Sequence, residues 1–195
     1  MNDFNQILNK EWEQLYNATK TAKHPYHHFT LSNIVNNKPE SRTIILRSVD
    51  KDKRTIRFNT DKRSPKYKAL QKDKHISALF YSLERKVQLR VTGYVQLNKT
   101  KLELNTIWDS MERESKLCYM GKFSPSSKIK NYEPNIPLQK ITDISDEEYK
   151  LGLNNFINID IIIDNIDWLY LHSSGHKRIK YEWIKDNLNS HWLAT

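Results

Sequence analysis

The chain has 195 residues, a length that suits one domain with a sizeable core. Its 32 Lys and Arg residues against 23 Asp and Glu residues give a formal charge of +9, so anions are its natural partners. The four glycines stand too far apart for a dinucleotide fingerprint or a Walker-type loop, which excludes nucleotide-fold enzymes of those two kinds. A single cysteine and no long apolar run indicate a cytoplasmic protein that neither enters a membrane nor holds a Cys-rich zinc site.

The first third of the chain changes from a helical to a β-type pattern. Apolar residues recur at helical spacing over about 3–18, which predicts an amphipathic helix that lies on the rest of the molecule as an appendage. Short β-rich runs at 29–35, 42–49 and 55–60, joined by polar turns, then predict an antiparallel meander. Ser64 and Pro65 open a short helix, as N-cap and first helical residue.

The rest of the chain continues as strands with few helices. Capping boxes that begin at Thr100 and Ser145 predict two helices, and the stretch 121–142 between them reads as a long loop. Further strands are expected at 76–82, 86–97, 157–163, 168–172 and 177–183, and a C-terminal tail over about 184–195. We therefore expect a single domain over 1–195, mainly β with peripheral helices, closed as a small barrel because closure removes exposed strand edges.

The most informative functional groups lie where a strand feeds a helix N-terminus. Ser64 and Lys66 stand beside free backbone N–H groups there, a combination that suits a phosphate. Arg42 and Arg47 are five residues apart on a strand and hence on opposite faces, so at most one of them is expected to share this site. A solvated basic surface beside a well-capped helix is the alternative interpretation.

Other polar residues have structural explanations that are at least as good as functional ones. Gln88 can donate and accept hydrogen bonds, but an outward-facing side chain explains it equally well. His24, His27 and His28 have no carboxylate at a suggestive spacing, so we interpret them as a polar loop, and we assign no metal site. Cys118 has no neighbouring base and is expected to be a buried, inert thiol.

In this order, the segments resemble the pyridoxamine 5′-phosphate oxidase-like family of FMN-binding split barrels, over about residues 29–181. The motifs that carry the resemblance are Arg42-Thr-Ile-Ile-Leu-Arg47, Phe58-Asn59-Thr60, Ser64-Pro65-Lys66 and Gln88-Leu-Arg-Val-Thr-Gly93. The third motif departs from the family's Ser-Arg-Lys, because Pro65 replaces the arginine. The resemblance implies a six-stranded antiparallel split β-barrel that binds FMN between the two subunits of a homodimer.

The resemblance also implies roles for individual residues. Arg42, Ser64 and Lys66 would hold the FMN phosphate, where charge-assisted hydrogen bonds suit a dianion. The ribityl chain and the ring would be lined by Thr43, Ile44, Ile45, Leu46, Arg47, Thr60, Gln88, Ser126 and Ser127. The family's flavin-contacting Trp falls at about Leu171 in this chain, so Arg178 is a candidate to replace part of that shell.

The resulting hypothesis is an FMN-dependent oxidoreductase that transfers hydride through flavin N5 and acts on a small molecule, with no catalytic residue assigned. The family's oxidase holds its substrate phosphate with a Tyr, an Arg and a Ser on one helix and with an Arg-x-His near the end. The aligned positions here are Ile107, Met111 and Ser115, then Lys177 and Ile179. Pyridoxine 5′-phosphate is therefore expected to be a poor substrate, with Ser115, Lys177 and Arg178 as candidate substrate contacts.

Two alternatives from other classes stay open at this point. One is a flavin-binding or haem-handling protein on the same barrel with little catalysis of its own. The other is a basic nucleic-acid-binding barrel, which the charge of +9 suggests but the dispersed Lys and Arg residues argue against.

Overall fold

The computed structural model describes residues 4–139 and 141–195. Its strands are β1 (His28–Val35), β2 (Lys38–Ile45), β3 (Ser48–Asp50), β4 (Thr55–Asp61), β5 (His75–Ser82), β6 (Val87–Gln96), β7 (Phe156–Tyr170), β8 (Lys177–Ile184) and β9 (Asn187–Leu193). Its helices are α1 (Phe4–Ala18), α2 (Pro65–Lys72), α3 (Lys101–Asp109), α4 (Arg113–Lys116) and α5 (Asp146–Asn155), with short 3₁₀ turns η1 (Leu117–Tyr119) and η2 (Ile141–Asp143).

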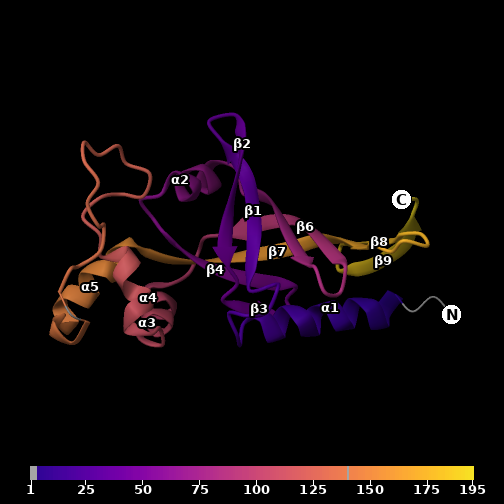
Figure 1. The fold of residues 1–195 in the computed structure, drawn as a ribbon, viewed down its shortest axis with the longest axis horizontal. Coiled ribbons are helices and arrows are strands. Elements are labelled where there is room, and N and C mark those ends of the chain that lie inside the picture. Colours follow the sequence, from indigo (N-terminus) through magenta and orange to yellow (C-terminus); the bar gives the residue numbers. More distant parts are fainter. Residues whose placement is uncertain (1–3, 140) are drawn as a thin grey trace.

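The described residues form one nine-stranded antiparallel sheet, ordered β2-β1-β5-β6-β7-β4-β3, to which β8 and β9 are added beside β7. Helices α3, α4 and α5 gather at one end of the molecule, and β8 and β9 lie at the other (Figure 1). The expectation of a mainly β fold with peripheral helices is confirmed. The principal core lies between the strands and α1 and is built from side chains such as Leu31, Phe58, Phe80, Leu89 and Ile159.

Strand β7 joins the two halves of the sheet. It is 15 residues long and pairs with β6, β4 and β8. The expectation of two separate strands at 157–163 and 168–172 is wrong, because β7 pairs with β6 on both sides of Asp164. Asp164 is the extra residue there, and its side chain accepts a hydrogen bond of 2.9 Å from Thr92 across the sheet. A bulge beside Gly93 accommodates the irregularity, and a Cβ at that position would lie 2.0 Å from the Ile162 carbonyl oxygen.

The expected strand at 42–49 is divided into β2 and β3 in the structure. The Leu46 amide donates to the His27 carbonyl at 2.9 Å, whereas the next amide, that of Arg47, donates to the Arg57 carbonyl at 2.8 Å. The chain therefore leaves β1 and joins β4 within one residue. Periodicity alone does not reveal this exchange of partner strands, because both segments are extended.

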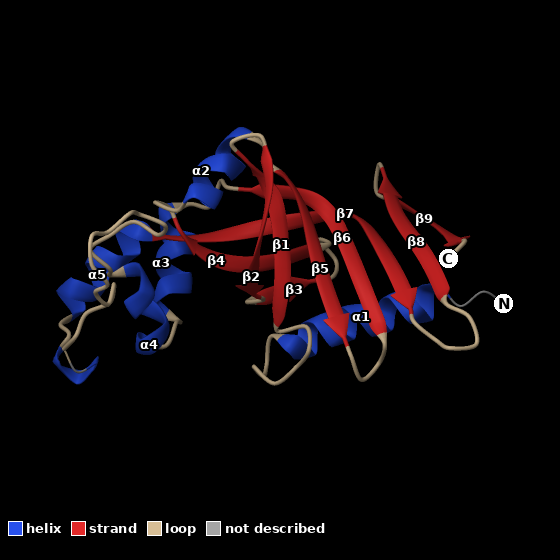
Figure 2. Ribbon diagram, turned by 45° about the horizontal axis from the view of Figure 1, so that its top comes forward, coloured by secondary structure: helices blue, strands red, loops and turns tan. Residues whose placement is uncertain are grey.

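Helix α1 confirms the predicted helix but corrects its role as an appendage. Its side chains Leu8, Trp12, Leu15 and Ala18 are buried in the same core cluster as the strands. In Figure 2, α1 runs beside the ends of β5 and β6. The helix therefore covers part of the sheet and completes its core.

The C-terminal segment expected as a tail forms β9, which pairs with β8. Lys185 and Asp186 form a two-residue hairpin loop with φ values of 48° and 69°, the left-handed region that type I′ turns require. Trp192 then packs edge-on against Phe4 of α1 at a ring-centroid distance of 5.3 Å. The pairing with β8 and the contact with Phe4 therefore hold the C-terminal segment against the rest of the fold.

Candidate functional site

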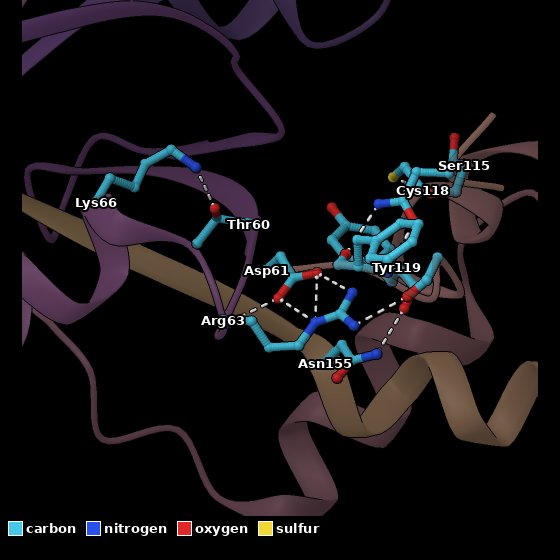
Figure 3. Close-up of polar contacts among 11 residues, drawn as sticks. Thr60, Asp61, Arg63, Lys66, Ser115, Cys118, Tyr119 and Asn155 are labelled. Atoms are coloured by element: carbon cyan, nitrogen blue, oxygen red, sulfur yellow. Dashed lines mark hydrogen bonds and ion pairs between the residues drawn. The ribbon is translucent and has the colours of Figure 1, made fainter. Parts of the chain in front are cut away.

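The turn between β4 and α2 is held by a buried carboxylate, Asp61 (Figure 3). Asp61 accepts hydrogen bonds from the Arg63 backbone amide at 2.7 Å and from its Nη2 at 2.8 Å. Arg63 Nη1 also donates to the Gly121 carbonyl at 2.9 Å, which ties the turn to a segment 58 residues away. Neither residue was singled out from the sequence, although Asp before a capped helix is a known turn signal.

The start of α2 agrees with the prediction made for it. The buried Ser64 hydroxyl accepts from the Tyr67 amide at 3.3 Å, and Pro65 is the first helical residue. The Ser64 amide donates to the Asp61 carbonyl at 3.1 Å. Capping thus aims the first turn of the helix, and with it Lys66, at the end of β4.

Lys66 is a partly buried cation whose pKa is lowered. Its Nζ donates to Thr60 Oγ1 at 2.5 Å (Figure 3). Burial, and secondarily the charge of Arg42, lowers the pKa of Lys66 from 10.5 to about 8, against an opposing effect of Asp61. Arg42 therefore lies within electrostatic reach of Lys66, and two neighbouring cations that repel each other favour an anion between them.

Arg42 extends from the buried face of β2. Its guanidinium donates to the Leu31 carbonyl at 3.2 Å, to Asn33 Oδ1 and to Glu40 Oε2 at 3.2 Å. Arg47 is exposed and lies after the end of β2, where the chain joins β4, so the strand spacing used in the prediction does not apply to it. Only Arg42 of the two arginines therefore accompanies Lys66.

The backbone of β2 offers polar groups beside these cations. β2 is an edge strand that pairs with β1, and the Leu46 amide bonds to His27 in that ladder. Because hydrogen-bonded pairs alternate along an antiparallel ladder, the N–H and C=O groups of Thr43 and Ile45 point away from β1. They are suited to a ligand, whereas the amides of Leu46 and Arg47 already have backbone acceptors.

Three other predicted cofactor contacts, Gln88, Ser126 and Ser127, do not lie beside Arg42 and Lys66 in the same chain. Gln88 lies on the outer face of β6, opposite Tyr81 and Leu169, whereas Arg42 shares the inner face with Leu31. Ser126 and Ser127 lie in an exposed loop. Gln88 therefore has the outward orientation that the sequence left open.

A cavity of about 740 Å³ lies between α3 and the strands β4 and β7. Arg47 and Ser115 both line it, and so do Ile107 and Met111, the positions where the family's oxidase has Tyr and Arg. The aligned helix positions thus face one cavity, whose helix side combines apolar side chains with hydroxyl and carboxylate groups.

Lys177 and Arg178 lie at the other end of the sheet from this cavity. Arg178 pairs with Leu169, about 35 Å along β7 from the cavity residue Asn158. Its guanidinium donates to both oxygens of Asp167, at 3.0 and 2.8 Å, and that buried carboxylate also binds Arg90 at 2.5 Å. The structure therefore separates Lys177 and Arg178 from Ser115 within one chain.

Two further expectations concern reactive or metal-binding side chains. Cys118 is exposed, so the prediction of a buried thiol is wrong, but partial desolvation raises its pKa and keeps it protonated at neutral pH. His27 Nδ1 lies 2.8 Å from the Ala18 carbonyl, so this residue connects β1 to α1. Among the described residues, no cluster of three metal-ligating side chains is found, and none of their helices is long and apolar enough to cross a bilayer.

Residues 5–99 match the family model of the pyridoxamine 5′-phosphate oxidase FMN-binding domain. The fold is similar to that of a pyridoxamine 5′-phosphate oxidase-related, FMN binding protein from Nostoc punctiforme PCC 73102, with a TM-score of 0.72, 18% identity and 96% of both chains covered. It is also similar to PhzG from Burkholderia lata 383, solved with tetrahydrophenazine-1-carboxylic acid, with a TM-score of 0.68, 17% identity, and 97% of this chain and 91% of that one covered.

No curated protein gives a significant match. At these identities the solved structures establish the fold, and the match over residues 5–99 establishes the family of that segment. Residues 5–99 therefore belong to the pyridoxamine 5′-phosphate oxidase FMN-binding domain family, and the chain has the antiparallel split-barrel fold of related FMN-binding proteins.

Proposed function

We propose that the chain is an FMN-dependent oxidoreductase that acts on a small-molecule substrate. The observation that carries the proposal is the pair of cations Arg42 and Lys66, at the N-terminus of α2 and beside the edge of β2. The FMN phosphate has close to two negative charges at neutral pH, so it fits a site with two cations and a helix N-terminus. The family of residues 5–99 gives the same cofactor.

Each part of the site has a role in this proposal. Arg42 and Lys66 bind the phosphate, and Thr60 orients the Lys66 ammonium through their hydrogen bond. The outward backbone groups of Thr43 and Ile45 hold the rest of the cofactor against β2. When bound, FMN supplies hydride transfer at its N5, and the protein positions and tunes it.

We also propose a homodimer, because the outer face of β1, β5 and β6 is partly apolar. Ile34, Leu79, Tyr81 and Tyr94 are 37–45% exposed on these strands. Gln88 lies on the same face, so a second subunit seated there would place Gln88 toward its partner's cofactor. We propose a reducing, cytoplasmic location, because a chain with a single cysteine cannot form an internal disulfide.

The proposal is tested by replacing Arg42 with Ala. This change removes a charge-assisted contact worth about 1.5–3 kcal/mol, so we expect FMN affinity to fall by about one to two orders of magnitude. Titration of flavin fluorescence at fixed salt measures the effect. Arg54→Ala is the matched control, because Arg54 pairs with Asp186 on another part of the surface and its loss should leave affinity unchanged.

Equal FMN affinity in Arg42→Ala and the wild type would refute the phosphate assignment. Catalysis is tested separately, by anaerobic reduction or reoxidation of the bound flavin with candidate electron donors and acceptors. A protein that binds FMN tightly but never exchanges electrons with a small molecule would be a flavin-binding barrel and not an oxidoreductase.

A further inference from the structure

Two asparagines form the strand side of the cavity between α3 and the sheet. Asn59 on β4 and Asn158 on β7 stand directly opposite each other, and Asn158 Nδ2 donates to Asn59 Oδ1 at 2.8 Å. Both residues line the cavity, although Asn158 is only 3% exposed. Asn158 lies beyond residues 5–99, so the family match does not assign it a role.

Met111 sets the orientation of this amide pair. Asn59 Nδ2 donates to Met111 Sδ at 3.6 Å, and a thioether sulfur can only accept a hydrogen bond. Asn59 must therefore present its oxygen to Asn158, and Asn158 must present its Nδ2 in return. The remaining Asn158 oxygen has no donor among the residues that the structure describes. A buried acceptor of this kind favours a ligand that brings an N–H or O–H group.

The cations around the cavity differ in how far they are neutralised. Arg57 Nε and Lys99 Nζ both contact Asp160, at 2.9 and 2.8 Å. The Arg47 guanidinium, by contrast, has no ion pair with any described residue. One unpaired arginine suits a monoanion such as a carboxylate better than a dianionic phosphate, which needs more cations.

The other lining groups restrict the ligand further. Glu103 belongs to the capping box with Thr100, and Glu112 is exposed at the rim. On the helix side, Leu102, Ile107 and Met111 supply apolar surface. It lies beside the hydroxyl residues Thr106, Ser110 and Ser115. A ligand in this cavity therefore has an apolar body between its charged and its donating ends.

We propose that this cavity binds a small carboxylic acid with an apolar body and a hydrogen-bond donor, its carboxylate at Arg47 and its donor at the Asn158 oxygen. Asn158 is thus a specificity-determining residue. That this acid is the substrate class rests on the proposed function. The binding preference itself requires no turnover.

The experiment compares 4-hydroxybenzoate with 4-fluorobenzoate, which have the same shape and charge but differ in the hydrogen-bond donor. Titrations with the full chain, followed by NMR with and without added FMN, should show about tenfold or more preference for 4-hydroxybenzoate. Asn158→Ala should reduce the preference to about twofold or less. Asn165→Ala, on the same strand but outside the cavity, should retain it.

Two more variants separate the contributions of Asn158 and Arg47 to probe binding. Asn158→Leu removes the acceptor while filling the space, so it should also abolish the preference and controls for any loosening caused by alanine. Arg47→Gln should weaken both probes by about tenfold and leave their ratio intact. Circular dichroism confirms that each variant folds.

The proposal is overturned by equal affinity of the two probes for the wild type, by a preference that survives in Asn158→Ala, or by no binding up to about 10 mM. FMN is titrated in the same samples. Loss of FMN binding with an intact probe preference counts against the oxidoreductase only, and normal FMN binding without the preference counts against this inference only.

Discussion

Lys66 shows how a single residue can make cofactor binding depend on pH. In the free protein its pKa of about 8 means that the ammonium begins to lose its proton just above neutrality. A phosphate dianion binds the protonated form better, because it neutralises the repulsion between Lys66 and Arg42. Binding must therefore be accompanied by proton uptake above this pKa.

We expect FMN affinity to be nearly constant from pH 7 to about 8 and to fall by up to about tenfold for each further pH unit. The Lys66→Arg variant keeps its charge throughout this range, so its affinity should change little to about pH 9.5. Flavin titrations at constant ionic strength measure both proteins. A decline of equal steepness in the two would show that another group titrates.

Met111 gives the second prediction at the residue scale, because it occupies the position of the oxidase's substrate-binding arginine. With Ile107 and Met111 in the cavity, oxidation of pyridoxine 5′-phosphate should have a kcat/KM at least about a hundredfold below 10⁴ M⁻¹s⁻¹. Met111→Arg should raise it by about tenfold or more, whereas Met111→Leu should not. Steady-state kinetics check this, and efficient oxidation by the wild type would mean that the helix has been aligned wrongly.

At the scale of secondary-structure elements, α1 is joined to the sheet by a buried carboxylate. Glu11, 2% exposed, accepts hydrogen bonds from the Tyr26 hydroxyl, the Arg85 guanidinium and the Trp168 indole N–H. Burial, followed by the nearby charge of Glu11, raises the pKa of the Tyr26 hydroxyl, which therefore remains a donor. One side chain thus connects the helix to three separate parts of the barrel.

Glu11→Ala should therefore destabilise the fold by about 3–5 kcal/mol, because it leaves Arg85 and two donors without their acceptor. Urea unfolding followed by tryptophan fluorescence measures the change. The matched control, Glu13→Ala, removes an exposed carboxylate of the same helix and should change stability by no more than about 0.5 kcal/mol. Similar losses in both variants would indicate that α1 depends on helix propensity and not on this contact.

At the scale of the whole molecule, the proposed dimer links the sheet face to the cofactor. Leu79→Glu places a charge on the apolar outer face of β5, so we expect a monomer in place of the dimer by light scattering. FMN affinity should fall in the same variant, since the partner's Gln88 is lost from the site. Leu151→Glu, the same change at a more exposed leucine on α5, should affect neither property. A monomeric wild type with fully bound FMN would contradict the proposal.

The sequence by itself determined the features that depend on neighbours a few residues away. The helical period of α1, the N-cap at Ser64 and the capping boxes at Thr100 and Ser145 are all present in the structure. Such features are predictable because the hydrogen bonds and side-chain directions that define them are local.

Only the tertiary structure decided the features whose partners are distant in the chain. Asn59 and Asn158 are 99 residues apart, and Glu11 and Trp168 are 157 apart, so no local pattern indicates either contact. The continuity of β7 depends on its bulge at Asp164, opposite Thr92 and Gly93 of β6, and the division at Leu46 depends on which strand accepts each amide. These outcomes are set by burial and by the pairing of polar groups across the fold. Such long-range contacts leave no local pattern in the sequence from which they could be predicted.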